Sequence, residues 1–121
     1  MSKKEYDFKG VMDFYPYYLT EHSNPTCRIL HFIGTSIALM IGVYSLLAQT
    51  PSYLLVGVVQ GYAFAWVGHF FFEKNKPATF RYPLWSFMCD WIMWWNMING
   101  QVERQLEKAM KKYKPGVRFR S

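Results

Sequence analysis

The chain has 121 residues and a net charge of +6, and half of its residues are apolar. Its mean hydropathy is nevertheless close to zero, so the apolar residues must be concentrated in part of the chain. The length allows one domain, and two isolated cysteines, Cys27 and Cys89, argue against a disulfide framework. We expect no cleavable signal peptide, because the first 28 residues contain no continuous apolar run.

Residues 5–24 form an aromatic-rich segment ahead of the apolar part of the chain. Phe8, Met12 and Tyr15 recur at roughly helical spacing, and tyrosine rings are favoured where a membrane meets water. We therefore predict an interfacial segment here, in which Pro16 breaks any helix.

Residues 29–72 contain no Lys, Arg, Asp or Glu. A helix rises about 1.5 Å per residue and the hydrocarbon core of a bilayer is about 30 Å thick, so roughly 20 residues make one crossing. These 44 residues therefore hold two crossings. We predict transmembrane helices over residues 25–50 and 52–73, with a turn at residues 49–52 between them.

Local signals support both helices. Asn24 followed by Pro25 is typical of an N-cap and a first helical position. The second helix carries Gly57-x-x-x-Gly61 and then Gly68, small residues that allow close contact between helices in a membrane. The same small residues permit a homodimer but do not demand one.

The basic residues are unevenly distributed, because all fourteen Lys and Arg lie outside residues 29–73. Basic loops stay on the cytoplasmic side of a membrane, so we expect a cytoplasmic N-terminus and an outward-facing turn. The basic excess indicates contact with anionic lipid. We expect no nucleic-acid partner, because the aromatic residues lie in apolar runs and not on a basic soluble face.

Residues 82–98 form a third apolar element, which holds four of the five tryptophans and one acid, Asp90. If it crossed fully, the basic tail at residues 101–114, a predicted amphipathic helix, would lie outside, and translocation of so many basic residues is disfavoured. We predict a partly inserted or hairpin-like element. The expected fold class is an all-α integral membrane protein, with two full transmembrane helices, this third membrane element and amphipathic terminal helices, in a single membrane domain over residues 1–121.

All three histidines lie near the same ends of the two predicted transmembrane helices. His22 and His31 flank the start of the first helix and His69 lies near the end of the second, so antiparallel helices would bring them into one layer. Glu73, four residues after His69, lies on the same helix face. Imidazole and carboxylate groups bind non-haem Fe(II) and also zinc, so these four residues are candidate metal ligands.

Other interpretations of these residues stay open. His22 at a helix mouth could be solvated, and Glu73 could pair with Lys74 or Lys76 at the interface. Cys27 could be a soft ligand, although a small buried filler is the favoured interpretation. An unpartnered imidazole within an apolar helix would be costly, so the convergence of all three histidines favours a site.

Asp90 and Arg28 are the candidate catalytic residues. An acid within a tryptophan-rich segment needs a partner, so Asp90 is a metal ligand, a partner of a ligand, or an ion-pair partner of Arg81 or Arg28. Arg28 could hold a substrate carboxylate through two hydrogen bonds, or could bind lipid phosphate.

Several enzyme classes lose support from the sequence. It contains no serine nucleophile elbow, phosphate-binding glycine loop, HExxH or CxxC motif. The paired HxxHH boxes of membrane desaturases are also missing from it.

Two strings of residues are specific enough to indicate a family. They are YYLxEHxNPxxRxxHFxGT at residues 17–35 and WxGHFxFExNxPATF at residues 66–80, the second followed by Pro83, Trp85, Ser86 and Asp90. The chain resembles the small membrane proteins, long catalogued as a domain of unknown function, that include the fungal 2-hydroxy-fatty-acid dioxygenase. The similarity covers about residues 10–100.

This resemblance implies an Fe(II)-dependent α-oxidation, in which O2 converts a 2-hydroxy fatty acid to a fatty acid one carbon shorter. It implies that histidines hold the iron, and His22, His31 and His69 are the matching positions. It also implies an integral membrane location, in the inner membrane of a bacterium or the endoplasmic reticulum of a eukaryote. The expected cofactor is Fe(II), the co-substrate O2, and the partners are the lipid bilayer and the 2-hydroxy fatty acid.

Two functions of other classes remain open. A non-enzymatic protein that binds membrane lipid or a partner would be metal-free and would keep its fold when its histidines are replaced. A zinc-dependent lipid hydrolase would act without O2, which a dioxygenase cannot do.

Overall fold

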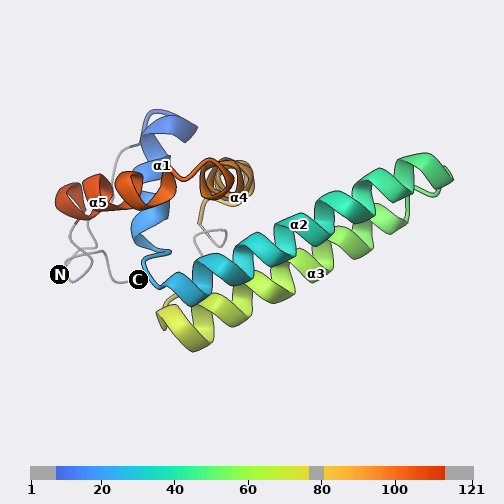
Figure 1. Cartoon of the computed structure of the whole chain (residues 1–121), viewed down its shortest axis with the longest axis horizontal. Coiled ribbons are helices and arrows are strands. Elements are labelled where there is room, and N and C mark those ends of the chain that lie inside the picture. The colour runs from blue at the N-terminus through green and yellow to red at the C-terminus, as the bar shows by residue number, and fades with distance from the viewer. Residues whose placement is uncertain (1–7, 77–80, 114–121) are drawn as a thin grey trace. The chain divides into compact units, whose positions relative to one another are not determined.

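The computed structural model describes residues 8–76 and 81–113, and these residues form helices and no strand. The all-helical fold class is therefore confirmed. The elements, in chain order, are α1 (Val11–Thr20), α2 (Pro25–Ala48), α3 (Tyr53–Val67), the π-helix η1 (Gly68–Glu73), α4 (Pro83–Ile98) and α5 (Val102–Lys112) (Figure 1). They belong to two compact units, a hairpin unit (residues 24–77) and a terminal unit (residues 1–23 and 78–121).

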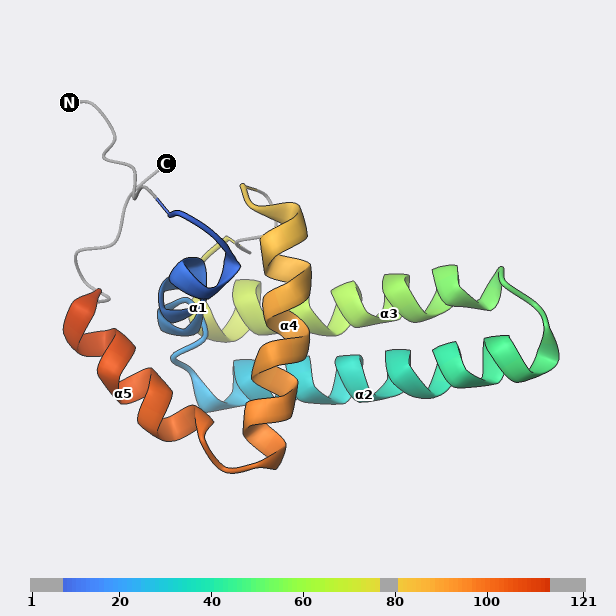
Figure 2. The same ribbon diagram turned by 90° about the horizontal axis from the view of Figure 1, so that it is seen from above.

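The hairpin unit consists of two helices that run side by side in both views, α2 and the continuous α3–η1 helix (Figures 1 and 2). Asn24 caps α2 as predicted: its Oδ1 accepts hydrogen bonds from the N–H groups of Thr26 (2.8 Å) and Cys27 (3.3 Å). Pro25 occupies the first helical position. The turn also lies where it was predicted, and Gln49, with φ of 54°, ends α2 in the left-handed conformation.

Small residues bring the two helices of the hairpin together. A methyl group on Gly34 would lie 3.0 Å from Cβ of Phe64 and 3.2 Å from the carbonyl oxygen of Gly61. Beside this contact, Nε2 of Gln60 donates to the carbonyl oxygens of Gly34 (2.9 Å) and Gly57 (2.8 Å). The bond to Gly34 ties α3 to α2, and such bonds are each worth about 1 kcal/mol net.

The second helix reaches Glu73 as predicted, but its last six residues, Gly68–Glu73, are a π-helix. Such widened turns are rare and frequently occur at functional sites. The backbone then reverses at Lys74, whose φ is 60°, and the N–H of Asn75 donates to the carbonyl oxygen of His69 (3.0 Å). The hydrophobic pattern contains no signal for this widened turn.

Both helices of the hairpin are long and apolar enough to cross a membrane, by length and composition. Large apolar side chains on them are exposed, for example Leu46 (74 %), Leu47 (79 %) and Leu55 (68 %). Contiguous exposed apolar surface of this kind marks an interaction site in a soluble protein and is ordinary in a lipid-facing helix.

The terminal unit contains α1, α4 and α5 around an aromatic core. Phe14, Tyr18 and Leu19 of α1 and Cys89 and Met93 of α4 are almost completely buried. The predicted amphipathic tail helix is α5, which begins at Val102 and ends at Lys112. It buries Val102, Leu106 and Ala109 and exposes its charged residues.

Pro16 does not break the N-terminal helix, so that prediction is wrong. Pro16 lies inside α1, which continues to Thr20. Proline removes one backbone donor and disfavours a helix interior. Here the neighbours on either side, Tyr15 and Tyr17, are buried in the core, and we attribute the continuation to that burial.

Candidate metal centre

His31 on α2 and His69 on η1 meet inside the hairpin unit. Their rings pack edge to face with centroids 4.9 Å apart, and the two residues are 4 % and 2 % exposed. The antiparallel helices therefore bring these two histidines into one layer, as the sequence predicted.

Hydrogen bonds fix the tautomer of both rings. Nδ1–H of His31 donates to the carbonyl oxygen of Cys27 (2.8 Å), and Nδ1–H of His69 donates to Oδ1 of Asn75 (2.8 Å). An imidazole that donates from Nδ1 carries its lone pair on Nε2, which is how metal-binding histidines are commonly oriented. Both rings thus present Nε2 as the ligand atom.

Cys27 brings a thiol to the same place. It is completely buried one helical turn before His31, and its Sγ lies 3.7 Å from Nδ1 of that histidine. The ligand atoms of Cys27, His31 and His69 lie within 4.8 Å of one another. From sequence alone, a filler role for Cys27 was the favoured interpretation, although its spacing of four residues from His31 could have indicated a shared helix face.

His22 belongs to the terminal unit, where it is 1 % exposed. Its Nδ1–H donates to the carbonyl oxygen of Tyr18 (2.7 Å), and its ring stacks on that of Tyr18 with centroids 4.1 Å apart. His22 therefore has the same tautomer as His31 and His69, with the lone pair on Nε2. Its role as a ligand stays a prediction.

Asp90 on α4 is held by Tyr18, a residue that was not among the predicted site residues. The hydroxyl of Tyr18 donates to Oδ1 of Asp90. Burial raises the pKa of Asp90 to about 7, although the hydrogen bond from Tyr18 opposes that rise. Tyr18 therefore touches both Asp90 and His22, and only a tertiary contact reveals this.

Glu73 and Arg28 lie outside the cluster of Cys27, His31 and His69. Glu73 accepts a hydrogen bond through Oε2 from the backbone N–H of Asn24, which ties the end of η1 to the start of α2. Arg28 is 4 % exposed and lies on α2 one turn before His31. The ligand role of Glu73 and the substrate role of Arg28 stay predictions.

A family model described as "2-hydroxy-palmitic acid dioxygenase Mpo1-like" matches residues 8–102. The chain belongs to the Mpo1-like family. The matched residues run from just before α1 to the start of α5, so they include every candidate residue discussed above. Neither the curated proteins nor the solved structures contain a match to the chain.

The dioxygenase named in the Mpo1-like family description fits a protein that can hold a metal ion. The buried group offers two imidazole nitrogens and one sulfur, each able to bind a divalent transition metal. The hydrogen bonds at Nδ1 are of the kind that orient metal ligands in proteins. These residues therefore fit a metal ion. Imidazole suits both iron and zinc, so the ligand set by itself does not select one of them.

Proposed function

We propose that this protein is a membrane-embedded, Fe(II)-dependent dioxygenase that converts 2-hydroxy fatty acids to fatty acids one carbon shorter. The observation that carries the proposal is the pair of buried imidazoles, His31 and His69, both oriented with Nε2 as the ligand atom in a chain of a dioxygenase-named family.

In this proposal His22, His31 and His69 hold the iron through their Nε2 atoms. Only four residues separate His22 from Cys27 in the chain, and this short separation supports the inclusion of His22. Bound Fe(II) supplies open coordination positions for O2 and for the substrate's oxygen atoms. Glu73 positions the helix ends through its bond to Asn24, and its alternative role is that of a further ligand.

The reaction balances with O2 as the only oxidant. The bond between C1 and C2 of the 2-hydroxy acid breaks, and C2 is oxidised to the carboxyl carbon of the shorter acid. C1 leaves as CO2, and O2 is reduced, so that one water is released. Arg28, buried and one turn from His31, binds the substrate carboxylate through its two-pronged guanidinium group.

In this proposal the bilayer surrounds the acyl chain of the substrate. We propose that α2 and the α3–η1 helix cross the bilayer, with the histidine layer near the cytoplasmic face and the N-terminus in the cytoplasm. The exposed leucines of the hairpin support this arrangement. The bilayer would be the inner membrane of a bacterium or the endoplasmic reticulum of a eukaryote, and α4 would be partly inserted.

The test is metal content together with turnover. Wild-type protein, His31→Ala and His69→Ala are purified without O2, loaded with Fe(II), desalted and assayed with 2-hydroxypalmitate. We expect about one iron per wild-type chain and O2-dependent formation of the C15 acid, both lost in the two variants. Tyr44→Phe, at the far end of α2, is the control and should behave as wild type. Unchanged turnover in both histidine variants would contradict the proposal.

Cys27 favours a second candidate, a zinc enzyme acting on a lipid ester or amide. Thiolate is a common zinc ligand, and Cys27 lies within the ligand group. This candidate predicts stoichiometric zinc in the purified protein, loss of zinc in Cys27→Ser, and lipid hydrolysis without O2. The dioxygenase predicts strict dependence on O2, so one anaerobic assay separates the two.

A further inference from the structure

The terminal unit contains a groove that the proposed chemistry does not use. It has a volume of about 320 Å³ and lies between α1, α4 and α5. This volume is near the lower end of the range of small-molecule sites, which is roughly 300–1,000 Å³. Its apolar walls come from Met12, Pro16, Leu19, Ile92 and Ala109.

The polar side chains in the groove bond to one another. The hydroxyl of Tyr15 donates to Oε1 of Gln105 (2.9 Å), and Nδ2 of Asn96 contacts the Tyr15 hydroxyl (3.3 Å) and donates to the carbonyl oxygen of Ile92 (2.9 Å). Because these groups satisfy one another, an apolar chain can cover them with little loss of hydrogen bonding. The interior of the groove therefore suits a hydrocarbon.

The charges of the groove are of one sign. Lys108 and Lys112 are the charged residues among those that line it, and they lie one helical turn apart on α5. Both are exposed, and the ammonium group of Lys112 lies 5.2 Å from the centre of the Tyr113 ring. Two cations beside an apolar groove complement a molecule with an apolar chain and an anionic head.

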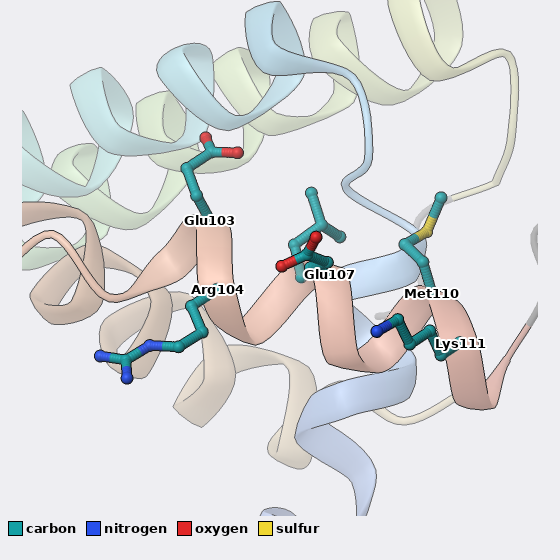
Figure 3. Close-up of a pocket in the computed structure, with 6 residues that line it drawn as sticks. Glu103, Arg104, Glu107, Met110 and Lys111 are labelled. Carbon is teal, nitrogen blue, oxygen red and sulfur yellow. The ribbon is translucent and has the colours of Figure 1, made fainter.

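A second depression on α5 carries charges of both signs. It is lined by Glu103, Arg104, Glu107 and Lys111, with Leu106 and Met110, and so carries two acids and two bases (Figure 3). The two depressions share no residue. The basic residues of the second depression therefore provide matched controls for those of the groove.

We propose that the groove binds one long-chain fatty acid anion, with its hydrocarbon between α1, α4 and α5 and its carboxylate beside Lys108 and Lys112. The choice of a fatty acid among anionic amphiphiles rests on the proposed function, whose substrate and product are both of this class. The groove shares no residue with the candidate metal ligands. It is a holding site, not the place of reaction.

The experiment is photo-crosslinking with palmitic acid that carries a diazirine on its chain, in vesicles of phosphatidylcholine. It uses the full chain with His31→Ala and a chelator, so that the metal centre does not contribute. We expect adducts on the peptides that contain Met12 or Ile92. Lys108→Gln/Lys112→Gln should reduce them about tenfold, the effect of roughly 1.4 kcal/mol from two surface charges. Arg104→Gln/Lys111→Gln should leave them unchanged.

Three results would overturn the site. Equal labelling of the two double variants would show that Lys108 and Lys112 do not contribute to binding. Labelling by a diazirine hexadecanol that is as strong as labelling by the diazirine palmitic acid would show that the carboxylate does not contribute. Displacement by phosphatidylglycerol as readily as by palmitate would assign the groove to a lipid headgroup. Turnover of the His31→Ala protein is measured separately, so that a failure of the metal centre and a failure of the groove are distinguished.

Discussion

Gly68 lies against Cys27 so closely that a methyl group on Gly68 would come within 2.9 Å of Sγ and 3.1 Å of Cα of that cysteine. This contact joins the first residue of η1 to the first turn of α2, beside both His31 and His69. A methyl group less than 3.0 Å from another heavy atom would force that atom or the methyl group to move. Here one of the contacted atoms, Cα of Cys27, belongs to the backbone, which cannot turn aside as a flexible side chain can. The absence of a side chain at Gly68 therefore sets the distance between the two helices at the metal centre.

Gly68→Ala should damage the metal centre. The added methyl group must push η1 away from α2, at a cost of about 1–3 kcal/mol for overpacking. We expect a lower melting temperature and at least tenfold weaker metal binding, measured by competition with a chelator. Gly57→Ala is the matched control, because its methyl group would meet Ile41 and Ala38 at ordinary distances of 3.5 and 3.6 Å. Equal metal affinity in the two variants would contradict this explanation.

Asn75→Ala should weaken metal binding without unfolding the hairpin. The variant removes the acceptor that holds Nδ1–H of His69, and loss of such a partner typically costs 10- to 100-fold in metal affinity. Asn75→Asp keeps an acceptor oxygen and should retain most of the affinity. Lys76→Ala, an exposed change one residue on, is the control. Metal titration followed by calorimetry measures all three, and full affinity in Asn75→Ala would show that the hydrogen bond is not needed.

Asp90 should make the protein less stable as pH rises. Its pKa is about 7 in the folded protein against an ordinary value of 3.8, so the folded protein holds this proton between about pH 4 and 7 while the unfolded chain releases it. Stability from this group is complete below pH 4 and is lost as pH rises through 7. We expect the change in melting temperature from pH 5 to pH 8 to be at least about 4 °C more negative in the wild type than in a variant that cannot titrate at position 90, the effect of roughly 1 kcal/mol.

Asp90→Asn should remove the contribution of this group, because the amide does not titrate and still offers an oxygen to Tyr18. Asp13→Asn, a change in the first turn of α1, is the control and should show the same change in melting temperature between the two pH values as the wild type. Melting curves at the two pH values compare the three proteins. The same change in melting temperature from pH 5 to pH 8 in the wild type and in Asp90→Asn would contradict this prediction.

Tyr18→Phe should destabilise the terminal unit by about 1–3 kcal/mol, since it removes the hydrogen-bond donor of a buried carboxyl group. The loss should be smaller when Asp90→Asn is already present, because the pair is coupled. Denaturant unfolding of both single variants and the double variant measures the coupling energy. Strictly additive losses would mean that the hydroxyl and the carboxyl act independently.

Local signals determined much of the hairpin unit. The uncharged run predicted two apolar helices, Asn24 and Pro25 marked the start of α2, and the polar turn ended it at Gln49. These signals act between residues a few positions apart, so a sequence contains them directly. The pairing of His31 with His69 followed from the same pattern, because antiparallel helices of known start and end have a known register.

The sequence by itself thus determined the all-helical class, the family, the hairpin and the candidate histidines. The tertiary structure alone decided the π-helical turn at Gly68, the place of Cys27 in the ligand group, the bond between Tyr18 and Asp90, and the continuation of α1 through Pro16. Each of these depends on which distant side chains pack together, and contacts between distant segments override local propensity when they bury enough surface. A one-dimensional pattern does not contain those contacts, and the fold supplies them.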